Sequence, residues 1–298
     1  METVKLVEVG PRDGLQNEKQ AVGTNDKLAL IRKLAEAGLN TIEAGAFVSP
    51  KWVPQMADSL AVLKALPLSG PVNYPVLVPN DKGMEQALEA GVREIAVFGA
   101  ASESFSQKNI NASIAESLAR FDSVMATARR HNVRVRGYVS CVVACPYEGR
   151  IAPAKVAEVA ARLLDMGCYE ISLGDTIGVG TPNTVLDMLE AVSKFVPMNQ
   201  LAGHFHDTYG MAISNIHASF GAGLRTFDSS VAGLGGCPYA RGASGNVATE
   251  DVVYLMQGLG VATGVDLSRL VAATWFVAGL LGREPDSRVA RALGRPEV

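Results

Sequence analysis

The amino-acid sequence predicts a (β/α)8 barrel, the TIM-barrel fold, with additional helices at its C-terminal end. Three observations lead to this prediction. Apolar runs rich in Val and Ile alternate eight times with segments of helical spacing, a pattern typical of a parallel sheet. The connections are short, and eight such units close into a barrel of about 250 residues. Predicted helices repeatedly end at glycine, the residue that fits a left-handed C-cap, as at Gly38, Gly91 and Gly167.

Each predicted strand is a short apolar run, and polar residues or chain-turning residues follow it. The strands are Val4–Val9, Thr41–Ala46, Val72–Val78, Glu94–Gly99, Val133–Val139, Glu170–Leu173, the run from Leu201 to His206, and Arg225–Val231. A polar loop up to Asn25 follows the first strand.

The predicted helices have apolar residues at a spacing of three or four. They are Asp26–Ala37, Gln55–Leu66, Asp81–Ala90, Ile114–His131, Ala154–Met166, Asn183–Phe195, Met211–Ala222 and Thr249–Leu259. Pro182 precedes one of them, and proline is favoured in the first helical turn. We expect two further helices in Gly264–Val298.

The predicted organisation is one domain over residues 1–298, with the barrel at about 4–260 and a helical extension at about 264–298. No linker, charge run or low-complexity segment indicates a second domain. A doubly wound open sheet is the alternative, but the first strand is not followed by the Gly-x-Gly-x-x-Gly turn of that fold.

Composition excludes several classes of protein. The net charge is −3 and the pI about 5.9, so no basic surface for nucleic acid is expected. The longest apolar run, around Leu270–Leu281, is too short to span a bilayer. Met1–Glu8 reads as a strand that contains acidic residues, and it lacks the pattern of a signal or transit peptide. Four scattered cysteines do not form a disulfide framework, so we expect a cytoplasmic protein.

His204 and His206 end the seventh strand, and they are two of only four histidines in the chain. Residues i and i+2 of a strand point to the same side, so both imidazoles can face one point. Paired imidazoles are a common way to bind a divalent metal. The alternative is two unrelated polar residues at a strand end.

Asp13 follows the first strand and is the natural anionic partner of these histidines, because the first, seventh and eighth strands are neighbours once the barrel closes. Asn246 could add a carbonyl oxygen. This set of ligands suits Mg²⁺ or Mn²⁺ as well as Zn²⁺. The alternative for Arg12-Asp13 is a surface ion pair or a helix cap.

Other polar residues follow the strands at the same end, where barrels of this kind carry their active sites. Glu43 in the second strand requires a partner if buried, and Arg12 is available. The remaining candidates for contact with a substrate are Gln16, Lys19, Asp175 and Thr176. Asp175 and Thr176 could instead cap the next helix.

Cys237 lies in the glycine-rich segment Val231–Asn246, where backbone can approach a ligand or close over it. We therefore interpret Cys237 as a functional thiol. The other cysteines lie in or beside apolar strands and are interpreted as core residues: Cys141, Cys145 and Cys168. His131 and His217 are interpreted as structural.

The blocks that contain these candidates resemble the hydroxymethylglutaryl-CoA lyase family. The resemblance runs from Val4 to about Ala292, and its motifs are Val9–Lys19, Phe47–Met56, Leu173–Gly180, His206–Gly210, Ser229–Ala240 and Gly242–Asp251. Isopropylmalate synthases and 4-hydroxy-2-oxoacid aldolases share the Arg-Asp and His-x-His motifs. Those relatives usually lack the cysteine loop or carry additional domains.

The resemblance implies cleavage of 3-hydroxy-3-methylglutaryl-CoA to acetyl-CoA and acetoacetate by a homodimer. It places Mg²⁺ or Mn²⁺ on four ligands, which are Asp13, His204, His206 and Asn246. It implies that Arg12 stabilises negative charge on the thioester oxygen and that Glu43 supports catalysis. It also assigns a proton transfer to Cys237 and places Lys19 near the CoA moiety. The base that takes the hydroxyl proton is left open between Asp13 and a neighbouring histidine such as His204. Gly282-Arg283 stands where some members have Asn-Arg, so a CoA contact from an asparagine would be missing there.

Two alternatives remain at this stage. One is a related condensing enzyme or aldolase of the same metal-dependent group. The other is a non-catalytic metal-binding barrel, which would need the ligands but not Arg12, Glu43 and Cys237 together.

Overall fold

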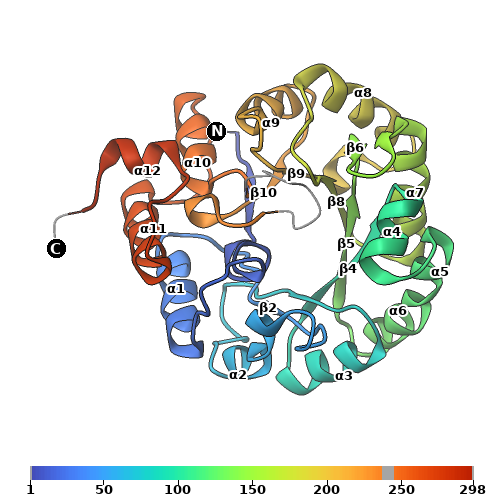
Figure 1. The fold of residues 1–298 in the computed structure, drawn as a ribbon, viewed down its shortest axis with the longest axis horizontal. Coiled ribbons are helices and arrows are strands. Elements are labelled where there is room, and N and C mark those ends of the chain that lie inside the picture. The colour runs from blue at the N-terminus through green and yellow to red at the C-terminus, as the bar shows by residue number, and fades with distance from the viewer. Residues whose placement is uncertain (1, 237–244, 297–298) are drawn as a thin grey trace.

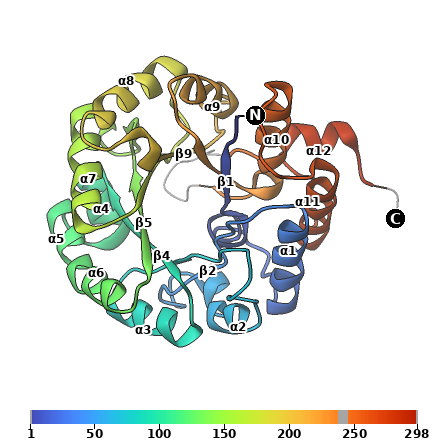
Figure 2. The same ribbon diagram turned by 180° about the vertical axis from the view of Figure 1, so that it is seen from behind.

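The computed structural model describes residues 2–236 and 245–296, and within them the predicted barrel is confirmed. Eight parallel strands form a central sheet, and helices surround it (Figures 1 and 2). In their order around the sheet, the strands are β1 (Lys5–Glu8), β10 (Thr226–Ser229), β9 (Leu201–Phe205), β8 (Glu170–Asp175), β5 (Arg134–Ser140), β4 (Glu94–Ala100), β3 (Val76–Leu77) and β2 (Gly45–Ala46).

The sheet closes between β1 and the segment that leads into β2. The backbone amide of Glu8 donates to the carbonyl of Thr41 at 3.0 Å, and the amide of Glu43 donates to the carbonyl of Glu8 at 2.8 Å. On its other side β1 pairs with β10, with Glu8 opposite Ser229. The first and last strands are therefore neighbours, which brings the loop after β1 close to the end of β9.

Most predicted helices occur with ends within two residues of the prediction, and the second of them begins four residues later than predicted. They are α1 (Thr24–Glu36), α2 (Ser59–Lys64), α3 (Asp81–Ala90), α7 (Pro153–Met166), α8 (Pro182–Ser193), α9 (Ala212–Gly221) and α10 (Thr249–Gly258). In the predicted helix Gln55–Leu66, a short 3-10 turn, η2 (Pro54–Met56), precedes α2. The three glycines expected after helices have φ of 103°, 80° and 108°, as a left-handed C-cap requires.

The prediction was wrong in three places. The single helix expected at Ile114–His131 is two helices, α5 (Ile114–Ala119) and α6 (Phe121–Arg130). The apolar spacing continues across the break, so the pattern could not reveal it. Helix α4 (Glu103–Ile110) and the hairpin of β6 (Ala144–Cys145) with β7 (Gly149–Arg150) were not expected, because α4 is mostly polar and the hairpin strands are two residues long.

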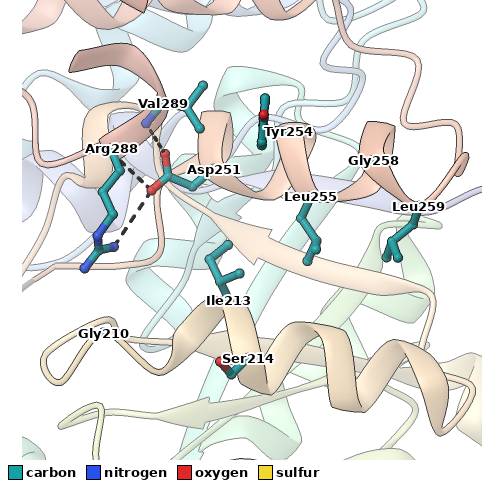
Figure 3. Close-up of a pocket in the computed structure, with 10 residues that line it drawn as sticks. All are labelled: Gly210, Ile213, Ser214, Asp251, Tyr254, Leu255, Gly258, Leu259, Arg288 and Val289. Atoms are coloured by element: carbon teal, nitrogen blue, oxygen red, sulfur yellow. Dashed lines mark hydrogen bonds and ion pairs between the residues drawn. The ribbon is translucent and has the colours of Figure 1, made fainter. Parts of the chain in front are cut away.

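The two helices expected after the barrel are α11 (Leu267–Leu281) and α12 (Arg288–Leu293), and α11 lies beside α1 (Figure 1). Asp251 of α10 fixes the start of α12, because its carboxylate accepts hydrogen bonds from the Ser287 hydroxyl and from the amides of Arg288 and Val289. Figure 3 shows this junction beside a groove between α9 and α10. None of the predicted metal ligands lines that groove. Among the described residues no helix is long and apolar enough to cross a membrane.

Candidate active site

Three of the four predicted metal ligands converge in the structure. One ligand atom each from Asp13, His204 and His206 lies within 4.8 Å of the others. The Nε2 atom of His204 is 3.9 Å from Oδ2 of Asp13, and the two imidazole centroids are 5.4 Å apart. Both histidines are buried, and Phe205 between them packs in the apolar core. The expected alternation of side chains along this strand therefore brings the imidazoles together.

Asn246 is the fourth predicted ligand and lies against the same carboxylate. Its side-chain nitrogen donates to Oδ2 of Asp13 at 2.8 Å. The backbone on both sides of Asn246 is tied to the end of β9, since Asp207 donates to the Gly245 carbonyl and Val247 donates to the Phe205 carbonyl. Side chains from the loop after β1, from β9 and from the segment before α10 thus meet at one point.

A π-helical turn, η1 (Gly10–Gly14), presents Asp13 to this point, where the sequence predicted only a polar loop. Close packing explains why Gly10 and Gly14 of this turn are glycines. A Cβ on Gly10 would lie 2.5 Å from Oε1 of Glu8, and one on Gly14 would lie 2.7 Å from the Ser230 hydroxyl. The two glycines let the turn sit directly on the ends of β1 and β10, which fixes the direction of Asp13.

The predicted ion pair between Arg12 and Glu43 is present and extends to Asp13. The guanidinium reaches Oε2 of Glu43 at 2.8 Å and Oδ1 of Asp13 at 2.7 Å. Burial disfavours the charge of Arg12, but the carboxylates of Glu43 and Asp13 outweigh this effect and raise its pKa. Arg12 is therefore a permanent cation with a fixed orientation beside the candidate metal ligands.

The protonation of the candidate ligands follows from their surroundings. Burial alone would raise the pKa of Asp13, but Arg12 and the two histidines have a larger opposite effect, so the pKa is lowered to about 2. Burial and the neighbouring His204 lower the pKa of His206 to about 4. At neutral pH Asp13 is an anion and His206 is uncharged, which are the forms that bind a cation.

The other candidates differ in what they contact. The Asp175 carboxylate accepts from the amides of Val179 and Gly180, and the Thr176 hydroxyl accepts from the amide of Cys141. Burial raises the pKa of Asp175 to about 6. Asp175 thus holds the turn after β8, and Thr176 ties this turn to the end of β5. The cap of the next helix, α8, is Thr181, so the capping alternative is wrong for both residues, and contact with substrate stays a prediction for them.

Gln16 and Lys19 follow η1, with Lys19 exposed. Oε1 of Gln16 is buried without a hydrogen-bond partner among the described residues. Gly282 ends α11 in the left-handed conformation, with φ 65°, which glycine and asparagine adopt most readily. Cys237 lies outside the described residues.

A group of polar residues inside the barrel was not predicted from the sequence. The Tyr138 hydroxyl donates to Oε2 of Glu43 at 3.3 Å and accepts from Arg136 at 3.1 Å. Asp228 of β10 accepts from Arg136 and is 3.1 Å from Nδ1 of His204. The signal was polar residues at alternate positions of a strand, as in Arg134-Val-Arg-Gly-Tyr138, which places Arg136 and Tyr138 on one side.

Two buried glutamates hold the segment that follows β10. Oε1 of Glu8 accepts from the amide of Val231, and Oε1 of Glu250 accepts from the amide of Ala232, whose φ is 61°. Burial raises the pKa of Glu8 to about 7 and that of Glu250 to about 8. At neutral pH Glu250 is therefore mostly protonated and Glu8 about half protonated while they support this turn.

This arrangement predicts a pH dependence of stability. A glutamate with a raised pKa binds a proton more readily in the folded state, so its contribution is complete below pH 4.5 and is lost as the pH rises to about 8. Glu250→Gln imitates the protonated form. Between pH 5 and 8 we expect the free energy of unfolding of the wild type to fall relative to that of Glu250→Gln, by up to about 4 kcal/mol. Urea unfolding at several pH values measures this difference, and parallel pH profiles would contradict it.

Comparisons with known proteins agree on one family. A family model described as HMGL-like matches residues 3–277. A protein of Bos taurus named "Hydroxymethylglutaryl-CoA lyase, mitochondrial" is 61% identical over 289 residues, covering 97% of this chain and 89% of its own. A Pseudomonas aeruginosa protein named "3-hydroxy-3-isohexenylglutaryl-CoA/hydroxy-methylglutaryl-CoA lyase" is 59% identical over 290 residues, which cover 97% of this chain and 97% of that protein.

Solved structures give the same result. The crystal structure of hydroxymethylglutaryl-CoA lyase from Pseudomonas aeruginosa superposes with a TM-score of 0.96 at 59% identity, over 98% of this chain and 97% of that one. An HMG-CoA lyase from Acinetobacter baumannii, in complex with coenzyme A and 3-methylmalate, superposes with a TM-score of 0.93 at 36% identity, over 98% of this chain and 95% of that one.

Proposed function

The chain belongs to the HMGL-like family, and from this premise we propose that it cleaves 3-hydroxy-3-methylglutaryl-CoA to acetyl-CoA and acetoacetate. The observation that carries the proposal is the identity of 59–61% with hydroxymethylglutaryl-CoA lyases over 97% of the chain. A condensing enzyme or a non-catalytic barrel is not favoured by relatives this similar. The protein is an enzyme, a carbon–carbon lyase.

We propose that a divalent cation, Mg²⁺ or Mn²⁺, binds Asp13, His204, His206 and Asn246. Two observations support the fit: the ligand atoms of Asp13 and the two histidines lie together, and the buried Nδ1 of His206 has no partner among the described residues. When bound, such a cation lowers the pKa of a hydroxyl group and orients it. A mixed set of imidazole, carboxylate and amide ligands also leaves room for substrate.

The chain's own residues supply the remaining chemistry. Asp13 and the two histidines meet at the proposed cation site, and we propose that one of them accepts the proton of the tertiary hydroxyl of the substrate. The carbon–carbon bond then breaks as the oxygen becomes a ketone, and the electron pair passes to the enolate of acetyl-CoA. Arg12 stabilises the negative charge that develops on the thioester oxygen. Glu43 holds Arg12 in place through the 2.8 Å ion pair.

Protonation of the enolate carbon completes the reaction, and we assign this step to the Cys237 thiol on the strength of the sequence alone. Lys19 is the proposed contact for CoA, together with Gln16, Asp175 and Thr176 for the acyl part. We further propose a homodimer in the cytoplasm. The buried thiols of Cys145 and Cys168, which form no disulfide, suit a reducing compartment.

The direct test is an assay of the purified protein with Mg²⁺ and hydroxymethylglutaryl-CoA. Acetoacetate and acetyl-CoA are expected in equal amounts, and no turnover is expected after removal of divalent cations with a chelator. Absence of both products with the cation present would reject the lyase. Sedimentation of the same sample tests the dimer.

A separate prediction concerns the metal ligands. We expect His204→Ala and His206→Ala to weaken Mn²⁺ binding at least about 100-fold, because each removes one ligand from the set, while the barrel stays folded. Titration calorimetry measures the affinity, and His131→Ala, at the end of α6, is the matched control. Wild-type affinity in both ligand variants would show that the cation binds elsewhere.

A further inference from the structure

A network of buried charges fills the barrel interior below the candidate metal site. Arg136 is among the most deeply buried side chains and pairs with two carboxylates. Its Nε atom donates to Glu170 at 2.7 Å, while its two terminal nitrogens donate to the two oxygens of Asp228 at 2.7 and 3.0 Å. Glu170 also accepts from Lys5. A fork of this kind holds a carboxylate in one orientation.

Asp228 connects this network to the candidate metal site. Its Oδ2 atom accepts from the Ser172 hydroxyl at 2.7 Å and lies 3.1 Å from Nδ1 of His204. Asp228 and His204 are register partners in the neighbouring strands β10 and β9, so their side chains leave the sheet on the same side. The contact is therefore a direct result of strand pairing.

The two nitrogens of His204 face different partners. Nδ1 meets Asp228, whereas Nε2 is directed toward Asp13 at 3.9 Å. Because Oδ2 of an ionised Asp228 can only accept, the proton between the two groups belongs to Nδ1, and Nε2 is the nitrogen that faces the proposed cation position. His206 differs, since its buried Nδ1 has no partner among the described residues.

We propose that Asp228 is a positioning residue for the metal site: it fixes His204 in the Nδ1–H tautomer and directs Nε2 toward Asp13 and His206, while Arg136 fixes Asp228. The inference rests on the proposed metal site. Carboxylates that orient metal-binding histidines in this way typically contribute about 10- to 100-fold to metal affinity.

The first test is the Mn²⁺ affinity of four variants, measured from the electron paramagnetic resonance signal of free Mn²⁺. Asp228→Asn keeps an oxygen beside His204 but loses the charge, and we expect about tenfold weaker binding. Asp228→Ala removes the acceptor, and we expect about 100-fold weaker binding. Glu170→Gln and Ser172→Ala are the matched controls, because each removes one partner from the same network without contacting His204. We expect both to stay within about threefold of the wild type.

The controls distinguish positioning from a general loss of structure. Thermal unfolding will be altered by Glu170→Gln as well as by the Asp228 variants, but only the latter are expected to change the Mn²⁺ affinity. Equal weakening by Glu170→Gln and Asp228→Asn would overturn the proposal, as would wild-type affinity in both Asp228 variants. If His204→Ala also binds Mn²⁺ normally, the metal site itself is wrong.

A second measurement does not depend on whether the Asp228 variants fold. The chain has four histidines, so ¹⁵N-labelled histidine gives a simple spectrum of the Mg²⁺-loaded wild-type protein. The signals that are present in the wild-type spectrum and absent from the spectrum of the His204→Gln variant belong to His204. We expect its proton on Nδ1. A proton on Nε2 would reject the proposed role of Asp228.

Discussion

Replacing Arg12 with lysine is expected to lower kcat by about 10²- to 10³-fold while KM changes by less than about tenfold. The guanidinium bridges Glu43 and Asp13 with its two terminal nitrogens, at 2.8 and 2.7 Å. A lysine ammonium keeps the charge but cannot span two carboxylates in one plane. It would move toward one of them and away from the thioester oxygen, whose charge develops during bond cleavage.

Steady-state kinetics at saturating Mg²⁺ measures this effect. Arg134→Lys is the matched control, because Arg134 belongs to the same strand as Arg136 but pairs with Glu94 at the opposite end of the barrel. We expect that control to keep wild-type kcat. If Arg12→Lys changed only KM, Arg12 would bind the substrate without stabilising the transition state.

Replacing Cys237 with serine is expected to lower kcat by about 10²- to 10⁴-fold and to leave Mn²⁺ affinity unchanged. A thiol has a pKa of about 8.5 and can give a proton to an enolate carbon, whereas a hydroxyl group is a far weaker acid. The prediction is based on the sequence, since Cys237 lies outside the described residues. Kinetics and calorimetry on the same preparation separate the two effects.

The remaining cysteines provide the controls for this prediction. Cys141, Cys145 and Cys168 are buried, and burial raises the pKa of Cys168 to about 12. Alkylation should therefore modify Cys237 first and abolish activity at the same rate, while Cys168→Ser keeps its turnover. First labelling of a different cysteine, or near-normal turnover in Cys237→Ser, would assign the proton donor to another group.

The convergence of the candidate metal ligands could be predicted because each position depends on local pattern and on one rule of topology. The two histidines needed only the alternation of a strand. Asp13 needed the knowledge that the first strand of a barrel lies beside the last, and the pairing of β1 with β10, with Glu8 opposite Ser229, shows that closure. The ion pair of Arg12 with Glu43 followed from the cost of a buried carboxylate.

The interior network could not be predicted in the same way. Arg136, Glu170 and Asp228 are charged residues in three separate strands, and a sequence gives no register between strands that are far apart in the chain. A charged residue within a strand usually indicates a solvent-facing position, yet here all three are buried. The same limit applies to Asp175, whose carboxylate accepts from two amides of its own turn.

The closure of the barrel determines when the metal site can form during synthesis. Asp13 and Asn246 lie on opposite sides of the junction between β1 and β10, and they are 233 positions apart in the chain. At a translation rate of about 5–20 residues per second, Asn246 is made roughly 12–47 s after Asp13. For this period a nascent chain contains Arg12 and Asp13 but not the complete set of proposed ligands. If the proposed ligands hold the cation, it is loaded only after Asn246 has been made, and a ribosome-bound fragment ending before residue 246 is expected not to retain Mn²⁺.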